Sequence, residues 1–501
     1  MRTPLMDSEE YIEAIRTGTE RVEEIQRFTR IDNHCVADLV SGVQDTQNDY
    51  DDDPAPRPVS RIDLSNIIKR FHTRAGTLTK TVSEELSAFE AGAQILRVAH
   101  QPNFLPYRGL MGQFVLLNTT AKELQMQDTG NVTQLYFIVD HDTARNYRFR
   151  TAHFPDPTQN EGVAPISVTE LINRKDTVMT AIDAPSSDTV NKWVKNIGDY
   201  ATVHNSKLAP SHPLGIHPDT IDQRKEQLQT LLQTAQECAR SMAEFNAIVL
   251  SRIVNGWWNL PTLFLPLSEC RSLLRPHYQY MLRRWGKIRE LAASTIELFE
   301  GKGFAFSTNL KARLDKVPFW YICPSCQSRN PVNNKSGNLD IESECCGCGV
   351  HLSRSFGTWT APDLGAELDQ ITPRTILDDL LDMIGFNIDG GVGYQSSLEH
   401  VIIAHSLATQ LGWTPPPELY WRPYGYDLTP TEVLADEALK GSTRPHIQNP
   451  ERALETVFTG RATIGYNILF NGCQNLRDRL TAHFDSDTTV NKPLATRSQL
   501  Q

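Results

Sequence analysis

The chain has 501 residues, more than one ordinary hydrophobic core covers, so we expect two or three domains. It is 40% hydrophobic and 22% charged, as in ordinary globular proteins, and its net charge of −11 argues against a surface that coats nucleic acid. The sequence has no apolar run long enough to span a membrane, and its charged N-terminus lacks the apolar centre of a secretory signal. These features predict a cytoplasmic protein, and nine cysteines fit that reducing compartment if several bind metal.

Apolar runs alternate with helical patterns along the chain, which is typical of parallel strands joined by helices. Strands are predicted at Ile95–Val98 and Leu135–Val139, with a helix at Gly109–Leu124 between them. Residues 176–185 are a further candidate strand, and apolar residues at threes and fours over Ile221–Ile253 predict one long helix. Later strands are expected in NGWWNLPTLFLPL and ELYWRPYG. This order predicts an α/β fold with a doubly wound, mostly parallel, Rossmann-like sheet.

The same patterns divide the chain into consecutive segments. The expected segments are an N-terminal part with a charged helix over 7–30 and an acidic linker at 44–58 (together 1–60), the first part of the Rossmann-like core (61–220), a long helix that is a candidate dimerisation element (221–256), a continuation of the core with helices (257–318), a zinc-ribbon insertion (319–355), the closing part of the core (356–430), and a C-terminal helical segment with a polar tail (431–501).

Two close cysteine pairs lie in the insertion. Cys323 and Cys326 in YICPSCQSRN are followed, after eighteen intervening residues, by Cys345 and Cys348 in ECCGCGVHL. This is the spacing of a zinc ribbon, in which each pair sits on a tight turn and four thiolates surround one ion. Cys346 lies inside the second pair and is an alternative ligand. We predict a structural zinc site that stabilises a small insertion without a core of its own.

Polar and titratable residues follow the predicted strands. They are His100, Gln101 and Asn103 after the first strand, Asp140, His141 and Asp142 after the second, and the turn glycines Gly390, Gly391 and Gly393. Ligands of doubly wound sheets bind beyond the carboxyl ends of the strands, so the sequence predicts one pocket there. Each group also has a structural alternative: His100 as a hydrogen-bonded core histidine, Asp142 as a helix N-cap, and the glycines as a plain turn.

Four motifs carry a resemblance to a known family. AHQPNFLPYRGL, FIVDHD, TPRTILDDLLDMIGFNIDGGVGYQ and GWTPPPELYWRP occur in this order. The set resembles the bacillithiol-biosynthesis cysteine-adding enzymes, and HQPNFLP also resembles the WbqC-like proteins. The first resemblance covers roughly residues 90–425 and implies a fold related to class I synthetases and nucleotidyltransferases. It implies a ligase that joins an amino acid of the cysteine type to a small-molecule amine.

Departures from the family pattern point to a related activity on another acceptor. Pro102 replaces a glutamine, Val139 replaces the glutamate before Asp-His-Asp, and Val392 replaces the proline of a Gly-Gly-Pro turn. The family pattern also has no zinc ribbon. We therefore expect a carbon–nitrogen ligase for a thiol or related metabolite, with ATP as the candidate co-substrate because carboxylates do not acylate amines unaided. The sequence has no dedicated phosphate-binding loop.

The resemblance assigns a role to each site residue. His100 and Gln101 would stabilise charge at a phosphoryl group, with Asn103 orienting it. Asp140 or Asp142 would hold the substrate ammonium, and His141 would accept the proton of the amine because its ordinary pKa is near neutral. The three glycines would offer backbone amides to an anion, and Arg422 would bind a carboxylate or, alternatively, form a structural ion pair.

Two further alternatives stay open at the level of sequence. His100, Asp140, His141 and Asp142 are residue types that can ligate a divalent ion, although neighbours on a strand point to opposite faces. The chain can also be a scaffold without catalysis, whose ribbon binds a protein or RNA through the aromatic residues of VPFWYICPSC.

Overall fold

The computed structural model describes the greater part of the chain before residue 302 and shorter pieces after it. The described residues are 29–33, 36–47, 60–106, 108–127, 130–145, 147–155, 163–168, 174–206, 216–301, 319–335, 338–358, 361–362, 371–373, 386–387, 418–421, 468–469 and 472–485. Most of the helix expected over 7–30 and of the linker expected at 44–58 lies outside them, as does the polar tail.

Six strands form the central sheet. Their order across it is β1 (Thr29–Asn33), β15 (Glu418–Trp421), β14 (Phe386–Asn387), β2 (Gln94–His100), β3 (Val132–Ile138) and β6 (Leu263–Pro266). Every neighbouring pair is parallel, and β2 and β3 pair over their whole length. The carboxyl ends of these strands therefore share one edge, and the expected parallel α/β sheet is confirmed.

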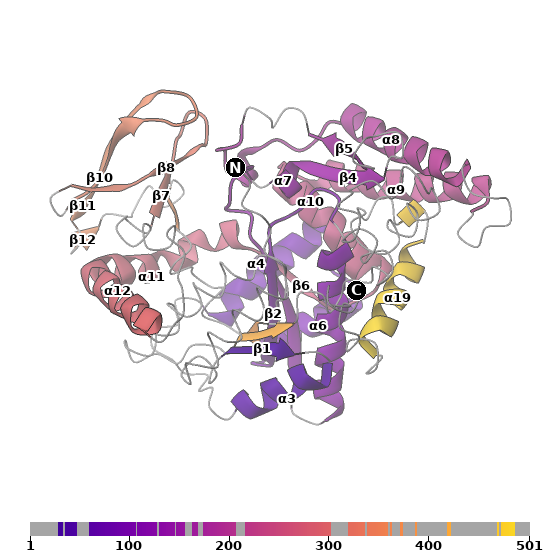
Figure 1. The fold of residues 1–501 in the computed structure, drawn as a ribbon, viewed down its shortest axis with the longest axis horizontal. Coiled ribbons are helices and arrows are strands. Elements are labelled where there is room, and N and C mark those ends of the chain that lie inside the picture. The colour runs from indigo at the N-terminus through magenta and orange to yellow at the C-terminus, as the bar shows by residue number, and fades with distance from the viewer. Residues whose placement is uncertain are drawn as a thin grey trace, which may run out of the picture.

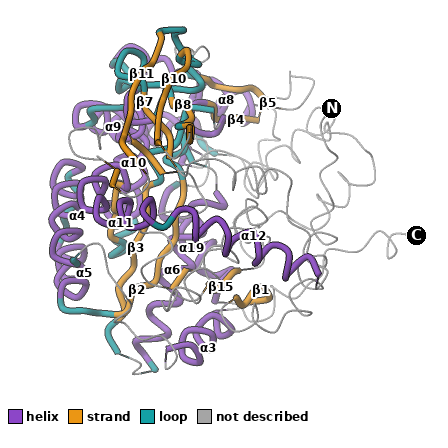
Figure 2. The backbone as a smooth tube through the Cα atoms, turned by 90° about the vertical axis from the view of Figure 1, so that its left-hand side faces the viewer, coloured by secondary structure: helices purple, strands orange, loops and turns teal. Residues whose placement is uncertain are grey.

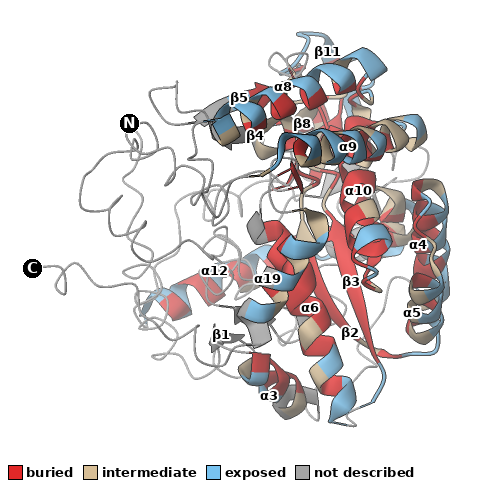
Figure 3. Ribbon diagram, turned by 90° about the vertical axis from the view of Figure 1, so that its right-hand side faces the viewer, coloured by how far each residue is buried: buried red, intermediate tan, exposed pale blue. Residues whose placement is uncertain are grey.

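Helices cover both faces of the sheet because successive side chains of a strand point to opposite sides. Tyr136 and Ile138 of β3 enter one core with α6 (Arg108–Met126) and α3 (Val36–Gln47), and Leu135 and Phe137 enter a second core with α4 (Arg61–Ala75) and α5 (Lys80–Glu90). Figure 2 shows α4 and α5 on one side of β2 and β3, and α6 and α3 on the other. All seven residues of β3 are buried (Figure 3), which explains the apolar run Leu135–Ile138 in its second half.

The single long helix expected over 221–256 is wrong. The chain forms α9 (Pro218–Cys238), breaks, and continues as α10 (Met242–Ser251) and a π-helical turn, η3 (Arg252–Trp257). Ser241 caps α10 by accepting a hydrogen bond from the backbone N–H of Glu244 at 3.2 Å. The apolar side chains of both helices lie in the core of this chain, packed against α8 (Ser187–Ser206) and neighbouring elements.

The strand expected at 176–185 is also wrong. Only isolated bridges form there, between Thr143 and Val178 and between Thr177 and Ser328, and a short 3-10 turn, η2 (Met179–Ala181), follows. The backbone of this segment bonds to two separate parts of the chain instead of to a neighbouring strand of the main sheet. It therefore connects the turn after β3 with the cysteine-bearing segment.

The remaining helices and one small sheet surround this core. They are α7 (Tyr147–Arg150), η4 (Leu267–Cys270), α11 (Arg271–Arg283), α12 (Trp285–Gly301), α19 (Cys473–Asp485) and the hairpin of β4 (Thr151–Pro155) with β5 (Val163–Ser167). Among the described residues, no helix has the length and apolar character needed to cross a membrane.

The cysteine-bearing segment forms two small antiparallel sheets beside α11 (Figure 1). One consists of β9 (Asn333–Lys335), β10 (Asn338–Glu344), β11 (His351–Thr358) and β12 (Ala361–Pro362), and the other of β7 (Phe319–Ile322), β8 (Arg329–Pro331) and β13 (Ile371–Pro373). Tyr321, Ile341 and Phe356 of these strands belong to the same apolar core as Leu265 of β6. The insertion is thus packed onto the main domain.

Candidate active site and metal centre

The turns after β2 and β3 leave the sheet side by side. His100 pairs with Ile138 in the last register position of the two strands, and the N–H of Val139 donates to the carbonyl of His100 at 3.0 Å. The Gln101 side chain then donates to Asp142 at 3.4 Å. The structure therefore brings together two of the segments that the sequence singled out, His100–Asn103 and Asp140–Asp142, at the carboxyl edge.

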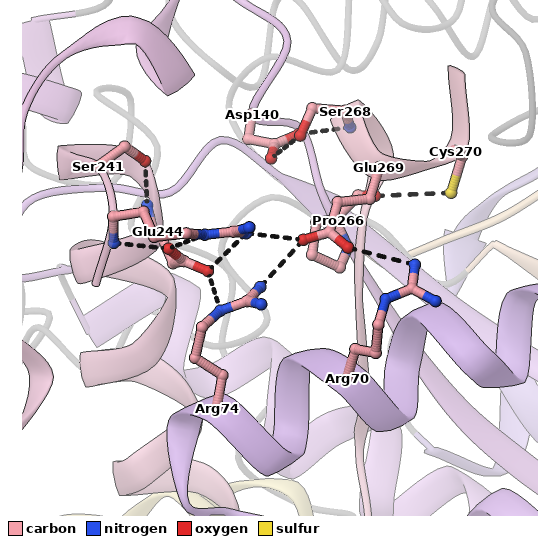
Figure 4. A network of polar contacts seen from close by, with 10 residues as sticks. Arg70, Arg74, Asp140, Ser241, Glu244, Pro266, Ser268, Glu269 and Cys270 are labelled. Atoms are coloured by element: carbon pink, nitrogen blue, oxygen red, sulfur yellow. Dashed lines mark hydrogen bonds and ion pairs between the residues drawn. The ribbon is translucent and has the colours of Figure 1, made fainter. Parts of the chain in front are cut away.

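Asp140 is the residue in these turns whose carboxyl faces a cavity. Its side chain accepts hydrogen bonds from Ser268, at 2.8 Å from the backbone N–H and 2.5 Å from the hydroxyl (Figure 4). Burial raises the pKa of Asp140 to about 6, although the Ser268 hydrogen bonds and the nearby Arg271 charge act in the opposite direction. Asp140 can therefore exchange a proton near physiological pH.

His141 differs from the expectation. Its pKa is lowered to about 4, mainly by burial and then by the charges of Arg271 and Arg329, against the opposing effect of Asp142. The imidazole is neutral at pH 7, but it is too weak a base to hold a proton there. The expected near-neutral pKa of His141 is thus not produced by this environment, and Asp140 is the better proton acceptor.

Three groups bind the carboxylate of Asp142. Its Oδ1 accepts from the backbone N–H of Thr143 at 2.7 Å and lies 3.0 Å from Nη2 of Arg329, and Gln101 donates to Oδ2. The next helix, α7, begins only at Tyr147. The alternative that Asp142 is the N-cap of that helix is therefore wrong.

The HQPN turn supplies two further polar side chains. Nδ1 of His100 is 2.9 Å from the carbonyl of Gln101, and the hydroxyl of Tyr136 donates to the His100 carbonyl at 3.3 Å. The Asn103 side chain is 3% exposed, and among the described residues neither its amide nitrogen nor its oxygen has a hydrogen-bond partner. Asn246 of α10 holds this turn by donating to the carbonyl of Pro102 at 2.9 Å.

A cavity of about 220 Å³ lies at the carboxyl ends of β3 and β6. Its wall is formed by Phe71, Ile138, Asp140, Thr180, Arg240, Ser241, Ala243, Glu244, Ala247, Pro266, Ser268 and Glu269. These residues come from five separate stretches of the sequence, so no local motif reveals the cavity.

Charged side chains of both signs line the cavity, and Figure 4 shows the contacts that join them. Arg240 bonds to Glu244 and to Glu269 at 3.0 Å each, and Arg74 of α4 contacts the same two carboxylates. Burial would raise the pKa of Glu244, but hydrogen bonds and charge from Arg240 and the charge of Arg74 lower it overall. Glu244 is therefore an anion at neutral pH, in the wall of the same cavity as Asp140.

The four predicted metal ligands come together. The sulfurs of Cys323, Cys326, Cys345 and Cys348 all lie within 4.8 Å of one another. Two of these separations are 3.9 Å, between Cys323 and Cys348, and 3.5 Å, between Cys326 and Cys345. A tetrahedral zinc ion with Zn–S bonds of about 2.3 Å requires sulfurs about 3.8 Å apart. The set fits zinc, and Cys346 stands outside it with its thiol directed to the carbonyl of Arg329.

The two cysteine turns have the same backbone structure. In each, the first cysteine donates its N–H to the carbonyl five residues later and accepts from the N–H four residues later. Gln327 and Gly349 occupy the equivalent fourth position with φ of 60° and 71°. Gly347 is required for a different reason: a Cβ there would lie 2.0 Å from Oγ and 2.8 Å from Cβ of Ser328. The turns are thus preshaped to hold thiolates around one ion.

His100, Asp140, His141 and Asp142, all of them described, do not come close enough together to share one metal ion. Among the residues that the structure describes, the four cysteines are the only group of three or more potential ligands close enough to share an ion. The alternative in which His100, Asp140, His141 and Asp142 ligate one ion is therefore wrong.

Comparison with models of known protein families and with curated proteins finds no match for this chain. The site is therefore interpreted from its own geometry.

Four predicted site residues lie outside the described residues. They are Gly390, Gly391, Gly393 and Arg422. In the sequence, the glycines begin three residues after β14, and Arg422 directly follows β15. Their roles stay predictions.

The sequence reasoning missed several residues of the site, namely Ser268, Glu269, Arg240, Glu244 and Arg329. One signal was present: Ser241 and Glu244 form a Ser-x-x-Glu pattern, which marks a helix start. It would have revealed the break between α9 and α10 that brings Glu244 to the cavity.

Proposed function

We propose that this chain is a carbon–nitrogen ligase that joins a small amino acid to an amine acceptor through a nucleotide-activated carboxylate. The observation that carries the proposal is Asp140, a buried carboxyl with a pKa of about 6 in the wall of a cavity at the carboxyl edge of a parallel sheet. The motif resemblance supplies the reaction class, and the geometry supplies a proton acceptor.

The cavity suits a small zwitterion. A volume of about 220 Å³ is below the roughly 300–1,000 Å³ of pockets for drug-sized ligands, so we assign it to the amino acid alone. Its wall carries the guanidinium of Arg240 and the carboxylates of Glu244 and Glu269, which complement a carboxylate and an ammonium group. The nucleotide would bind outside this cavity, towards His100 and Gln101.

The reaction proceeds in two balanced steps. The amino-acid carboxylate attacks the α-phosphorus of ATP, forming an acyl adenylate and releasing pyrophosphate. The amine nitrogen then attacks the acyl carbon, the new C–N bond forms, the acyl–oxygen bond to AMP breaks, and the amine proton passes to Asp140. Asp142 would bind an ammonium group of the amine substrate other than the attacking nitrogen, which attacks as the neutral amine. His100 and Gln101 would stabilise charge on the phosphoryl group.

The test uses hydroxylamine as a general amine acceptor. The full chain is incubated with ATP, hydroxylamine and each amino acid in turn, and hydroxamate, AMP and pyrophosphate are measured. The proposal predicts hydroxamate in equal amount to AMP, for one small amino acid or a few, and only with ATP. No ATP-dependent product with any amino acid would overturn it.

A further inference from the structure

The metal-holding insertion contacts the candidate active site directly. Val178, in the connector after the DHD turn, donates its N–H to the carbonyl of Gln327 at 3.0 Å, and Arg329 donates its N–H to the carbonyl of Asp176 at 3.0 Å. Both ribbon residues lie within three positions of Cys326. The first cysteine turn is therefore bonded to the main domain through its backbone.

The same connector continues to the site. The N–H of Met179 donates to the carbonyl of Asp142 at 2.9 Å, and the N–H of Ala144 donates to the carbonyl of Thr177 at 3.0 Å. An unbroken set of backbone hydrogen bonds thus runs from the cysteine turn through residues 176–179 to residues 142–144. A shift in the backbone of the cysteine turn can therefore be transmitted to the backbone of Asp142 through these hydrogen bonds.

Arg329 adds a side-chain contact along the same route. Its Nη2 lies 3.0 Å from Oδ1 of Asp142, and both side chains are largely buried, with exposed fractions of 19% and 29%. The guanidinium also lies over the ring of Trp320, 5.2 Å from its centroid. This pair is shielded from solvent more than an ordinary surface ion pair, so it can fix the orientation of Asp142.

The backbone of Arg329 is held by the metal site. Its carbonyl accepts from the thiol of Cys346 at 3.2 Å, and the adjacent Asn330 side chain accepts from the N–H of Cys346 at 2.9 Å. Cys346 lies between the two metal ligands Cys345 and Cys348. Ser328, which precedes Arg329, packs against Gly347 of this second cysteine turn. The second cysteine turn therefore contacts residues 328–330, which directly follow the first cysteine turn.

We infer that Arg329 is a positioning residue through which the metal-bound ribbon fixes Asp142, so that zinc occupancy of the cysteine site controls the geometry of the carboxyl edge. The ribbon thus contacts the turn that carries Asp142, in addition to being a structural insertion. Its physical coupling to Asp142 is independent of the reaction, whereas its effect on catalysis rests on the proposed ligase function.

Hydrogen exchange of the full chain tests the coupling without requiring activity. We expect removal of zinc with a strong chelator to speed amide exchange at Thr143, Ala144 and Met179, and added zinc to restore it. Arg329→Gln, with one zinc per chain still bound, should speed exchange at the first two amides roughly three- to tenfold. Arg329→Lys should fall between this variant and the wild type.

Arg354→Gln is the matched control, since it removes an arginine from β11 of the same ribbon. The inference is overturned if zinc removal changes exchange only within residues 319–358, or if Arg329→Gln exchanges like Arg354→Gln. If the ligase assay succeeds, Arg329→Gln should raise the KM for the amine more than it lowers kcat, because Asp142 would bind the ammonium group. If the wild-type chain is inactive in the ligase assay, the KM cannot be compared. The hydrogen-exchange measurement then decides by itself whether zinc and Arg329 are coupled to Asp142.

Discussion

Replacing Ser268 by alanine removes the hydroxyl that donates to Asp140 at 2.5 Å but keeps the backbone N–H that donates at 2.8 Å. The lost hydrogen bond favours the ionised carboxylate, so the pKa of Asp140 must rise from about 6. A hydrogen bond to a charged group contributes about 1.5 kcal/mol at the low end of its range, and one pKa unit corresponds to about 1.4 kcal/mol. We therefore expect a rise of about one unit.

The direction of the stability change follows from proton binding. Between pH 3.8 and about 6, folded Asp140 binds more protons than the unfolded chain does, so its contribution is present below pH 3.8 and is lost as the pH rises through 6. In Ser268→Ala the pKa of folded Asp140 is expected near 7, so stability continues to fall until about pH 7. The variant should therefore be destabilised more at pH 8 than at pH 5.

The assay is a titration of the Asp140 carboxyl carbon by NMR, supported by urea denaturation at both pH values. Ser241→Ala is the matched control: Ser241 lines the same cavity, but its hydroxyl accepts from the N–H of Glu244 and does not contact Asp140. It should leave the pKa of Asp140 unchanged while weakening the cap of α10. An unchanged or lower pKa in Ser268→Ala would refute the reasoning.

Three further changes test the metal centre and the buried titratable groups. Gly347→Ala should weaken zinc binding at least tenfold in a chelator competition, whereas Gly286→Ala, where a Cβ meets no atom within 4 Å, should bind zinc as the wild type does. Burial raises the pKa of Glu85 to about 7 despite a hydrogen bond from the Gln134 N–H, so its contribution to stability is lost as the pH rises from 4.5 to 7. Glu85→Gln should therefore raise the free energy of unfolding at pH 8 by up to about 3 kcal/mol, with no comparable gain for the exposed neighbour Glu84→Gln. Burial lowers the pKa of His72 to about 3, so its contribution is present above pH 6.5 and is lost on acidification. The stability advantage of the wild type over His72→Gln should shrink by about 2 kcal/mol between pH 7 and pH 5, and a constant difference in urea denaturation would contradict this.

The parts of the molecule that depend on local pattern were predictable. The strand β3 contains the apolar run Leu135–Ile138, and β2 is mostly apolar between Ile95 and Ala99. The rule that ligands meet parallel sheets at their carboxyl edge located His100 and Asp140 on the correct side. The cysteine site was predictable because each ligand pair is set by a short turn and its spacing.

The break between α9 and α10 was missed because hydrophobic periodicity continues across it. Leu232 and Ala235 before the break and Phe245 and Val249 after it enter the same core, so the pattern reads as one helix. The N-cap formed by Ser241 starts a new helix at Met242. In the sequence, its only sign is a serine followed three residues later by Glu244.

The cavity was not predictable because its residues meet only through the fold. Ser268 reaches Asp140 across 128 positions, and Arg74 reaches Glu269 across 195. The same long-range packing sets the pKa values, since burial supplies the largest effect at both Asp140 and His141. Sequence alone gives these residues their ordinary pKa values, and it therefore assigned the proton acceptor to His141.

The most direct test of the account compares Asp140→Asn with Asp199→Asn in the ATP-dependent hydroxamate assay. Asp199 lies on α8 in an exposed ion pair with Lys195, so it provides a matched loss of one carboxylate away from the site. The account predicts that Asp140→Asn lowers the rate about 100-fold or more and that Asp199→Asn keeps the wild-type rate. Equal activity of the two variants would contradict the assignment of the carboxyl edge as the catalytic site.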